Sequence, residues 1–173
     1  MIEAAERLCD WIGNLSERLG QLAKWIVLFI IVAIAYDVFM RYALNAPTVW
    51  SWATSQMAGA CFISLGLAYT YRVRANVRVD VLYQKFSSRG RLIIDIVFTV
   101  LFFFPLFFIL TKLFWQDSWL AISTGQTDNS SAWSPLTWPF KTVVAFGFLV
   151  FLMQGVGTFL EDVLALAKEG KKS

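Results

Sequence analysis

Four blocks of apolar residues follow one another along the chain, at about residues 25–44, 49–71, 92–113 and 140–160. Each block has roughly 20 residues, and a helix of that length crosses the ~30 Å hydrocarbon layer of a bilayer. The apolar residues run continuously and do not alternate with polar ones, which favours helices over the strands of a membrane barrel. The pattern therefore predicts an all-α integral membrane protein, with four transmembrane helices in a single domain over residues 1–173.

Two shorter segments have the spacing of helices that are apolar on one side only. Residues 77–86 predict a short interfacial helix in the link between the second and third blocks. Residues 2–22 predict an amphipathic N-terminal helix that lies on the inner membrane surface or packs on a partner. Its apolar positions recur every three or four residues: Ile2, Ala5, Leu8, Ile12, Leu15, Leu19 and Leu22.

The positive charges are distributed unevenly between the links. Six of the fifteen Lys and Arg residues lie between Arg72 and Arg91, three precede residue 25, and three follow residue 167. Basic links stay in the cytoplasm, so this distribution predicts that both termini are cytoplasmic. The link 114–139 then lies outside, and its tryptophans suit the outer membrane interface: Trp115, Trp119, Trp133 and Trp138.

Composition narrows the possible chemistry. The chain is 58% hydrophobic, with a mean hydropathy of +0.60, which fits a protein whose outer faces contact lipid. Its net charge of +3 is too small and too scattered for nucleic-acid binding. The absence of histidine removes haem ligation by two histidines and histidine-based zinc sites. Cys9 and Cys61 have no metal or redox spacing. We expect no catalytic residue, cofactor or metal ion.

The charges within the apolar blocks can be neutralised locally. Asp37 and Arg41 are four residues apart, share one face of a helix and are expected to pair, as are Arg91 and Asp95. No predicted span then contains an unpaired carboxylate at mid-membrane depth. This counts against a transporter that couples to protons on its own.

Small and polar residues mark the faces on which helices approach closely. The second block contains Ala60, Ser64 and Ala68 at four-residue spacing, with Gln56 one turn earlier. The fourth block repeats the pattern with Gly147, Gln154 and Gly155. In the third block, which is rich in phenylalanine, Pro105 is expected to bend the helix because it removes a backbone donor.

The middle of the chain resembles the small membrane subunit, the four-span Q type, of TRAP (tripartite ATP-independent periplasmic) transporters. Residues 41–47 read RYALNAP, followed by Trp50-Ser51, the glycine of residues 64–66 (SLG) and NVRVD at 76–80. The order and spacing of these short motifs carry the resemblance. The four-span layout extends it over nearly the whole chain.

The resemblance implies a division of labour in sodium-driven, binding-protein-dependent uptake of an organic acid anion. A large multi-span subunit would hold the substrate and sodium sites, a periplasmic solute-binding protein would dock on the outer face, and this chain would brace the large subunit. It implies a multi-pass protein of the bacterial inner membrane. Partner contacts are expected at the following residues, none of which binds substrate: Arg41, Tyr42, Trp50, Gln56, Ala60, Ser64, Arg78 and Asp80.

Two other classes of protein remain open from the residues alone. Four spans are enough for a small homodimeric transporter that works without other subunits. A haem-free membrane anchor of an enzyme complex is also compatible with the absence of histidine.

Overall fold

The computed structural model describes residues 2–75, 88–130 and 132–170. These residues form long helices and one isolated β-bridge, between Thr127 and Leu136. The helices are α1 (Ile2–Ala43), α2 (Ser51–Arg72), α4 (Ser88–Phe98), the π-helical segment η1 (Thr99–Phe103), α5 (Phe104–Thr124) and α6 (Trp138–Gly170). The predicted interfacial helix at 77–86, with Arg78 and Asp80, lies outside the described residues.

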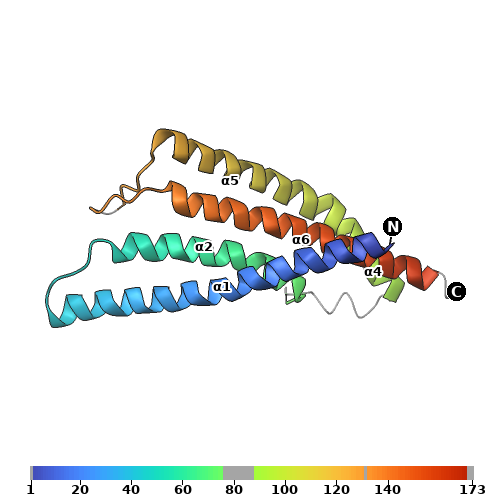
Figure 1. Cartoon of the computed structure of the whole chain (residues 1–173), viewed down its shortest axis with the longest axis horizontal. Helices are drawn as coiled ribbons and strands as arrows, with labels where there is room; N and C mark the ends of the chain where they lie inside the picture. The colour runs from blue at the N-terminus through green and yellow to red at the C-terminus, as the bar shows by residue number, and fades with distance from the viewer. Residues whose placement is uncertain (1, 76–87, 131, 171–173) are drawn as a thin grey trace.

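The long helices run lengthwise through an elongated molecule (Figure 1). The link 44–50 and the loop 125–137 lie at one end, which we call the loop end, and the N- and C-termini lie at the opposite, terminal end (Figure 1). Among the described residues, three helical stretches are long and apolar enough to cross a membrane: Cys9–Ala43, Arg89–Thr124 and Trp138–Ala167. The structure therefore confirms an all-helical protein with membrane-spanning helices.

The central helix is α6, which contacts α1, α2, α4 and α5. Half of its most apolar stretch is buried, against 11% for α1 and 6% for the stretch that contains α5. The hairpin of α1 and α2 and the α4–η1–α5 arm are thus held together mainly through α6. The α1–α2 hairpin and the α4–η1–α5 arm each have long exposed apolar surfaces.

The segment predicted as an N-terminal helix and the first predicted span form one continuous helix, α1, of 42 residues. At about 1.5 Å per residue it is ~63 Å long, roughly twice the hydrocarbon thickness. The N-terminal half does not lie free, because Ile12 and Leu19 are only 3% and 9% exposed and pack within the molecule. Leu22, which the sequence pattern placed on the same face, is 56% exposed. The buried face includes small residues that hydropathy alone does not select: Cys9, Ser16 and Ala23.

The core lies where α1, α2 and α6 meet. It contains Leu19, Ala23, Leu65, Ala68, Val150 and Phe151. Next to it, Ser16 Oγ donates to Gln154 Oε1 over 2.8 Å, although the two residues are 138 positions apart. Both side chains are almost fully buried. A hydrogen bond between transmembrane helices contributes on the order of 0.5–2 kcal/mol, so this pair fixes the register of α1 on α6.

Helices α2 and α6 approach closely at Ser64 and Gly147. A Cβ atom on Gly147 would lie 2.8 Å from the backbone carbonyl carbon and oxygen of Ser64. Only glycine permits this contact, because a methyl group would overlap the neighbouring backbone. The small residues of the second and fourth apolar blocks therefore meet each other inside this chain.

A π-helical segment, η1, begins six residues before Pro105, where the sequence predicts a bend. The N–H of Phe104 bonds to the carbonyl of Thr99, five residues earlier, so the helix gains a wide turn ahead of the proline. The wide turn presents Phe103 to α6, where its ring occupies the space that a side chain at Gly155 would need. Phe103 also contacts Phe151, with ring centroids 5.2 Å apart.

The helix that contains the third predicted span is longer than that span. Helix α5 continues to Thr124, so the first ten or so residues of the predicted link are helical, including Trp115 and Trp119. Gly125 ends the helix in a left-handed conformation, with φ of 60°. The polar segment after it, not the tryptophans before it, forms the loop.

We expect Gly147→Ala to destabilise the isolated chain and Gly66→Ala not to. Alanine gains helix propensity of ~1 kcal/mol at both sites, but overpacking costs about 1–3 kcal/mol at Gly147 alone. A Cβ on Gly66 meets nothing within 4 Å. Thermal unfolding in detergent, followed by circular dichroism, measures both variants. Equal melting temperatures would show that α2 and α6 do not meet at Gly147.

Candidate functional site

The best-defined polar structure at the loop end is centred on Asp37. Its Oδ2 accepts from an Arg41 Nη over 2.7 Å, which confirms the predicted pair. Its Oδ1 accepts from the backbone N–H of Thr48 over 3.0 Å and from the Thr48 hydroxyl in a shorter bond. One carboxylate therefore neutralises the arginine and ties the link 44–50 back to α1.

The rest of the link is tied at both ends. The N–H of Ala46 bonds to the carbonyl of Met40 over 3.1 Å, with Asn45 in a left-handed conformation that lets the chain leave the helix. At the other end, Trp50 stacks on Tyr36 at a centroid distance of 6.0 Å. Ser51 Oγ donates to the carbonyl of Ala33 over 3.2 Å. These contacts fix how the α1–α2 hairpin closes.

The structure brings some of the expected partner-contact residues together and separates others. Arg41 and Trp50 both belong to the corner around Asp37, while Tyr42 points away and is 83% exposed. Ser64 is buried against Gly147 of this same chain, so its side chain is not open to a partner. Thr48 carries no signal in the sequence, because its bonds to Asp37 form only when the link folds back onto α1.

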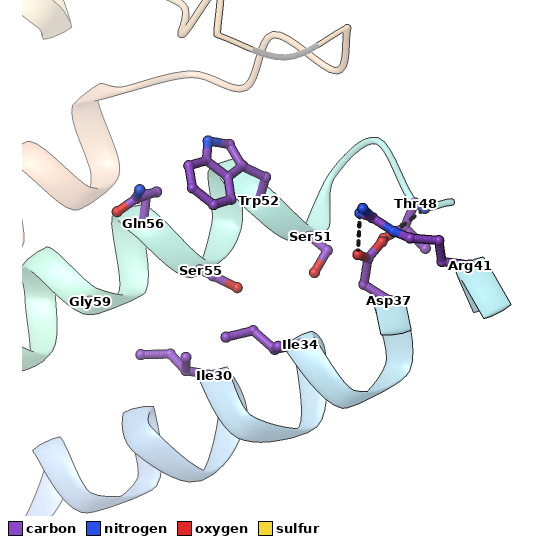
Figure 2. Close-up of a pocket in the computed structure, with 10 residues that line it drawn as sticks. All are labelled: Ile30, Ile34, Asp37, Arg41, Thr48, Ser51, Trp52, Ser55, Gln56 and Gly59. Carbon is purple, nitrogen blue, oxygen red and sulfur yellow. Dashed lines mark hydrogen bonds and ion pairs between the residues drawn. The ribbon is translucent and has the colours of Figure 1, made fainter. Parts of the chain in front are cut away.

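A groove opens beside this corner, between the outer surfaces of α1 and α2 (Figure 2). It has a volume of about 370 Å³ and is lined by Ile30, Ile34, Asp37, Arg41, Thr48, Ser51, Trp52, Ser55, Gln56 and Gly59. Figure 2 shows the Ser51 and Ser55 side chains on the side of α2 that faces α1, and Trp52 and Gln56 on the side of α2 that faces away from α1. We call this feature the α1–α2 groove.

The second loop at the same end is held by a different set of charges. Lys141 Nζ donates to Asp117 Oδ1 and to Gln126 Oε1, each over 2.9 Å, and so joins α5, α6 and the loop. Within the loop, the backbone N–H and hydroxyl of Ser130 donate to Asp128, which lowers the pKa of that carboxyl. A cleft of about 360 Å³ separates this loop from Gln56 of α2.

At the terminal end, one ion pair crosses between elements far apart in the sequence. Arg74 Nη donates to Asp162 Oδ1 over 2.6 Å, with Asp162 buried and Arg74 in a left-handed conformation, φ of 52°. The Arg72 guanidinium lies against Gly13 of α1, in space that a larger residue there would fill. The C-terminal end of α2 is thus fastened to both α6 and α1.

This arrangement suits a structural role better than a chemical one. Within residues 2–75, 88–130 and 132–170, no group of three or more Cys, Asp and Glu side chains could hold a metal ion. The polar side chains of the two ends mostly pair with one another across helices. The described surface offers other molecules long apolar helix faces, the α1–α2 groove and the cleft between Gln56 and the second loop.

We expect Asp37→Ala to loosen the link 44–50 without unfolding the helices. A hydrogen bond to a charged group contributes about 1.5–3 kcal/mol, so amide hydrogen exchange at Thr48 should quicken by about tenfold or more. Hydrogen-exchange mass spectrometry of peptides that cover the link measures this. Asp117→Ala, which removes the ion pair of the other loop, is the matched control. Unchanged exchange at Thr48 in Asp37→Ala would contradict the role given to Asp37.

No curated protein and no solved structure matched the chain. The sequence model of one family, described as the DctQ component of tripartite ATP-independent periplasmic transporters, matches residues 30–165, which is most of the chain. The matched region includes the Asp37 corner, the α1–α2 groove and nearly all of α6. The chain therefore belongs to the DctQ family and is the small membrane component of a TRAP transporter.

Proposed function

We propose that this chain is a bracing subunit for the large membrane subunit of its transporter. The observation that carries the proposal is the contrast between its ends and its sides. The ends are fastened by side-chain hydrogen bonds and ion pairs centred on Asp37, Lys141 and Asp162. The sides are long apolar helix surfaces with little burial in α1 and α5. A rigid helical subunit with exposed apolar sides can pack against the large subunit and hold it in place without binding substrate itself.

The transport that it supports is sodium-driven uptake of an organic acid anion delivered by a periplasmic binding protein. This part of the proposal rests on the likeness to TRAP transporters, whose family description names a periplasmic system. Substrate and sodium would bind in the large subunit. The binding protein would dock on the outer face, where the link 44–50 and the loop 125–137 lie together at one end (Figure 1).

We further propose that α2 is a fourth span and that the termini are cytoplasmic. With 22 residues, α2 is ~33 Å long, enough to cross the hydrocarbon layer. It runs beside the loop-end half of α1, and its two ends point toward opposite ends of the molecule (Figure 1). The excess of Lys and Arg near the terminal end supports this orientation in the bacterial inner membrane.

Residues near both ends are proposed to contact the partners. At the loop end these are Arg41, Tyr42 and Trp50, with Gln56 and Ala60 farther along α2. At the terminal end, Arg78 and Asp80, which lie outside the described residues, would fix the cytoplasmic link against the large subunit. Ser64 is withdrawn from this set because its contact is with Gly147.

We expect cysteine labelling to place α2 across the membrane. In a chain with Cys9→Ala and Cys61→Ala, Asn45→Cys and Asn129→Cys should react with an impermeant maleimide applied to the periplasmic side. Ala75→Cys should react only after the cells are permeabilised. Reaction of both Asn45→Cys and Ala75→Cys from the same side would show that α2 does not cross. Labelling of Asn45→Cys only from the cytoplasm would invert the orientation.

We expect uptake in reconstituted vesicles to require this chain together with the large subunit and the binding protein. Labelled mono- and dicarboxylates are offered with an inward sodium gradient, with potassium as the control gradient. Uptake that persists when the chain is omitted would rule out a bracing role, and uptake without sodium would rule out sodium coupling. Uptake by the chain alone would make it a transporter in its own right.

The same preparation tests the cytoplasmic link. Asp80→Ala should lower both the amount of large subunit that co-purifies with the chain and the uptake rate. Glu17→Ala, which removes an exposed carboxylate from the N-terminal half of α1, is the control. Normal co-purification and normal uptake by Asp80→Ala would remove Asp80 from the proposed contacts.

A further inference from the structure

We propose that the α1–α2 groove and the adjoining face of α2 form the surface on which a transmembrane helix of the large subunit docks. This face continues along α2 from Gly59 to Gly66. The docked helix would present small residues to the two glycines and at least one hydrogen-bonding side chain to Ser55 or Gln56. The inference rests on the bracing role proposed above and assigns it to one surface of the chain.

One hydroxyl group beside this surface, that of Ser55, lacks a hydrogen bond within the described residues. The Ser55 hydroxyl oxygen is buried from solvent and has no hydrogen-bond partner within the described part of the chain. It lies on the wall of the α1–α2 groove, one residue from the exposed amide of Gln56. Hydrocarbon chains neither donate nor accept hydrogen bonds, so lipid would leave both groups unsatisfied. A polar side chain from a neighbouring helix would satisfy the exposed Gln56 amide directly, and the Ser55 hydroxyl after the Ser55 side chain rotates to an accessible rotamer.

Two glycines of α2 have unoccupied space beside them. Several glycines of this chain already receive a neighbour: Gly147 faces Ser64, and Gly155 faces the ring of Phe103. Gly59 and Gly66 receive nothing within 4 Å. They are seven residues apart and so lie on one face of α2, two turns from each other. Small residues on an open face allow the backbone of another helix to approach closely.

Helix α2 is more polar than the spanning stretches of the other long helices, although it lies at the same membrane depth as part of α1. It packs along the loop-end half of α1, which is apolar enough to span a membrane, so the two helices share one depth. Among the long helices described, α2 alone is not apolar enough to be recognised as a span, because its first turns contain Thr54, Ser55 and Gln56. A helix at this depth with polar turns is stable when protein, not lipid, covers it.

The opposite side of the molecule shows what a lipid-facing surface looks like. The exposed side chains of η1 and the first half of α5 are large and apolar: Val100, Leu101, Phe102, Leu106, Phe108 and Ile109. That surface has no unmet hydrogen bond within the described residues and contains no glycine. The α2 face also exposes two large apolar side chains between its glycines, Phe62 and Ile63, so it differs from the η1–α5 surface in its glycines, the Ser55 hydroxyl and the Gln56 amide.

The shape of the surface selects the kind of partner. The α1–α2 groove is concave, with Ile30 and Ile34 on one wall and Ser55 and Gly59 on the other. Two copies of this chain that met groove to groove would leave both hollows empty and the Ser55 hydroxyls without partners. A single convex helix from the larger subunit fills the hollow.

The proposal is tested by filling the space. Gly59→Leu with Gly66→Leu adds two side chains where this chain has room, so the isolated chain should keep its melting temperature in detergent. The amount of large subunit that co-purifies should fall by about tenfold or more, since overpacking an interface costs a few kcal/mol. Ala35→Leu adds similar bulk to an exposed position on α1, on the side opposite the buried Ala33, and should leave co-purification unchanged.

Three results have distinct meanings. If the unmodified chain fails to co-purify with the large subunit, the bracing function itself is wrong. If it co-purifies and the double glycine variant does so equally well, bracing stands and the α1–α2 groove is not the contact. Loss of co-purification by Ala35→Leu to the same extent would also overturn the assignment, because any added bulk would then suffice.

Cross-linking identifies the occupant directly. In the chain with Cys9→Ala and Cys61→Ala, Gly59→Cys is expected to cross-link to the large subunit in native membranes when a short thiol-to-amine or photoactivated reagent is used. Phe102→Cys, on the large apolar face, is the control and is expected to give no such product. A Gly59→Cys product with a second copy of this chain, or no protein product at all, would overturn the proposal.

Discussion

The architecture depends on the close contact between α2 and α6 at Ser64 and Gly147. Because a Cβ at Gly147 would overlap the Ser64 backbone, the two helices approach at a distance that only glycine allows. That approach lets Leu65, Ala68, Val150 and Phe151 form a core with α1. It also turns the opposite face of α2 outward, with Gly59 and Gly66 uncovered. In a membrane, where apolar burial drives helix association only weakly, such close van der Waals contact is the main source of specificity.

Polar interactions then fix the ends of the helices. The Asp37 carboxylate joins α1 to the link 44–50, Lys141 joins α5 to α6, and Arg74 with Asp162 joins α2 to α6. The pairs of Lys141 and Arg74 bridge elements, and Asp37 is paired with Arg41 on its own helix while it also binds Thr48, which keeps the cost of charge near the bilayer low. The result is a frame that resists shear between its helices. This is the mechanical property that the proposed bracing role requires.

Several features could be predicted from the sequence because they depend on local composition. Continuous apolar blocks indicate membrane helices, and the i, i+4 spacing of Asp37 and Arg41 indicates their pair. The glycines of the fourth block indicate close packing. Element ends were less predictable. Helix α1 is continuous because nothing between the amphipathic segment and the apolar segment stops a helix, and α5 runs on to Gly125 because its tryptophans are compatible with helix.

The sequence by itself determined the class of this protein: an all-helical membrane component whose motifs, in their order, indicate the DctQ family. Only the tertiary structure decided which small residues face each other and which remain open. Ser64 and Gly59 are both small residues of α2, yet Ser64 is buried against α6 and a side chain at Gly59 would meet nothing within 4 Å. The reason is geometric. Hydropathy and spacing describe one helix at a time, whereas the partner of each face depends on how three helices cross.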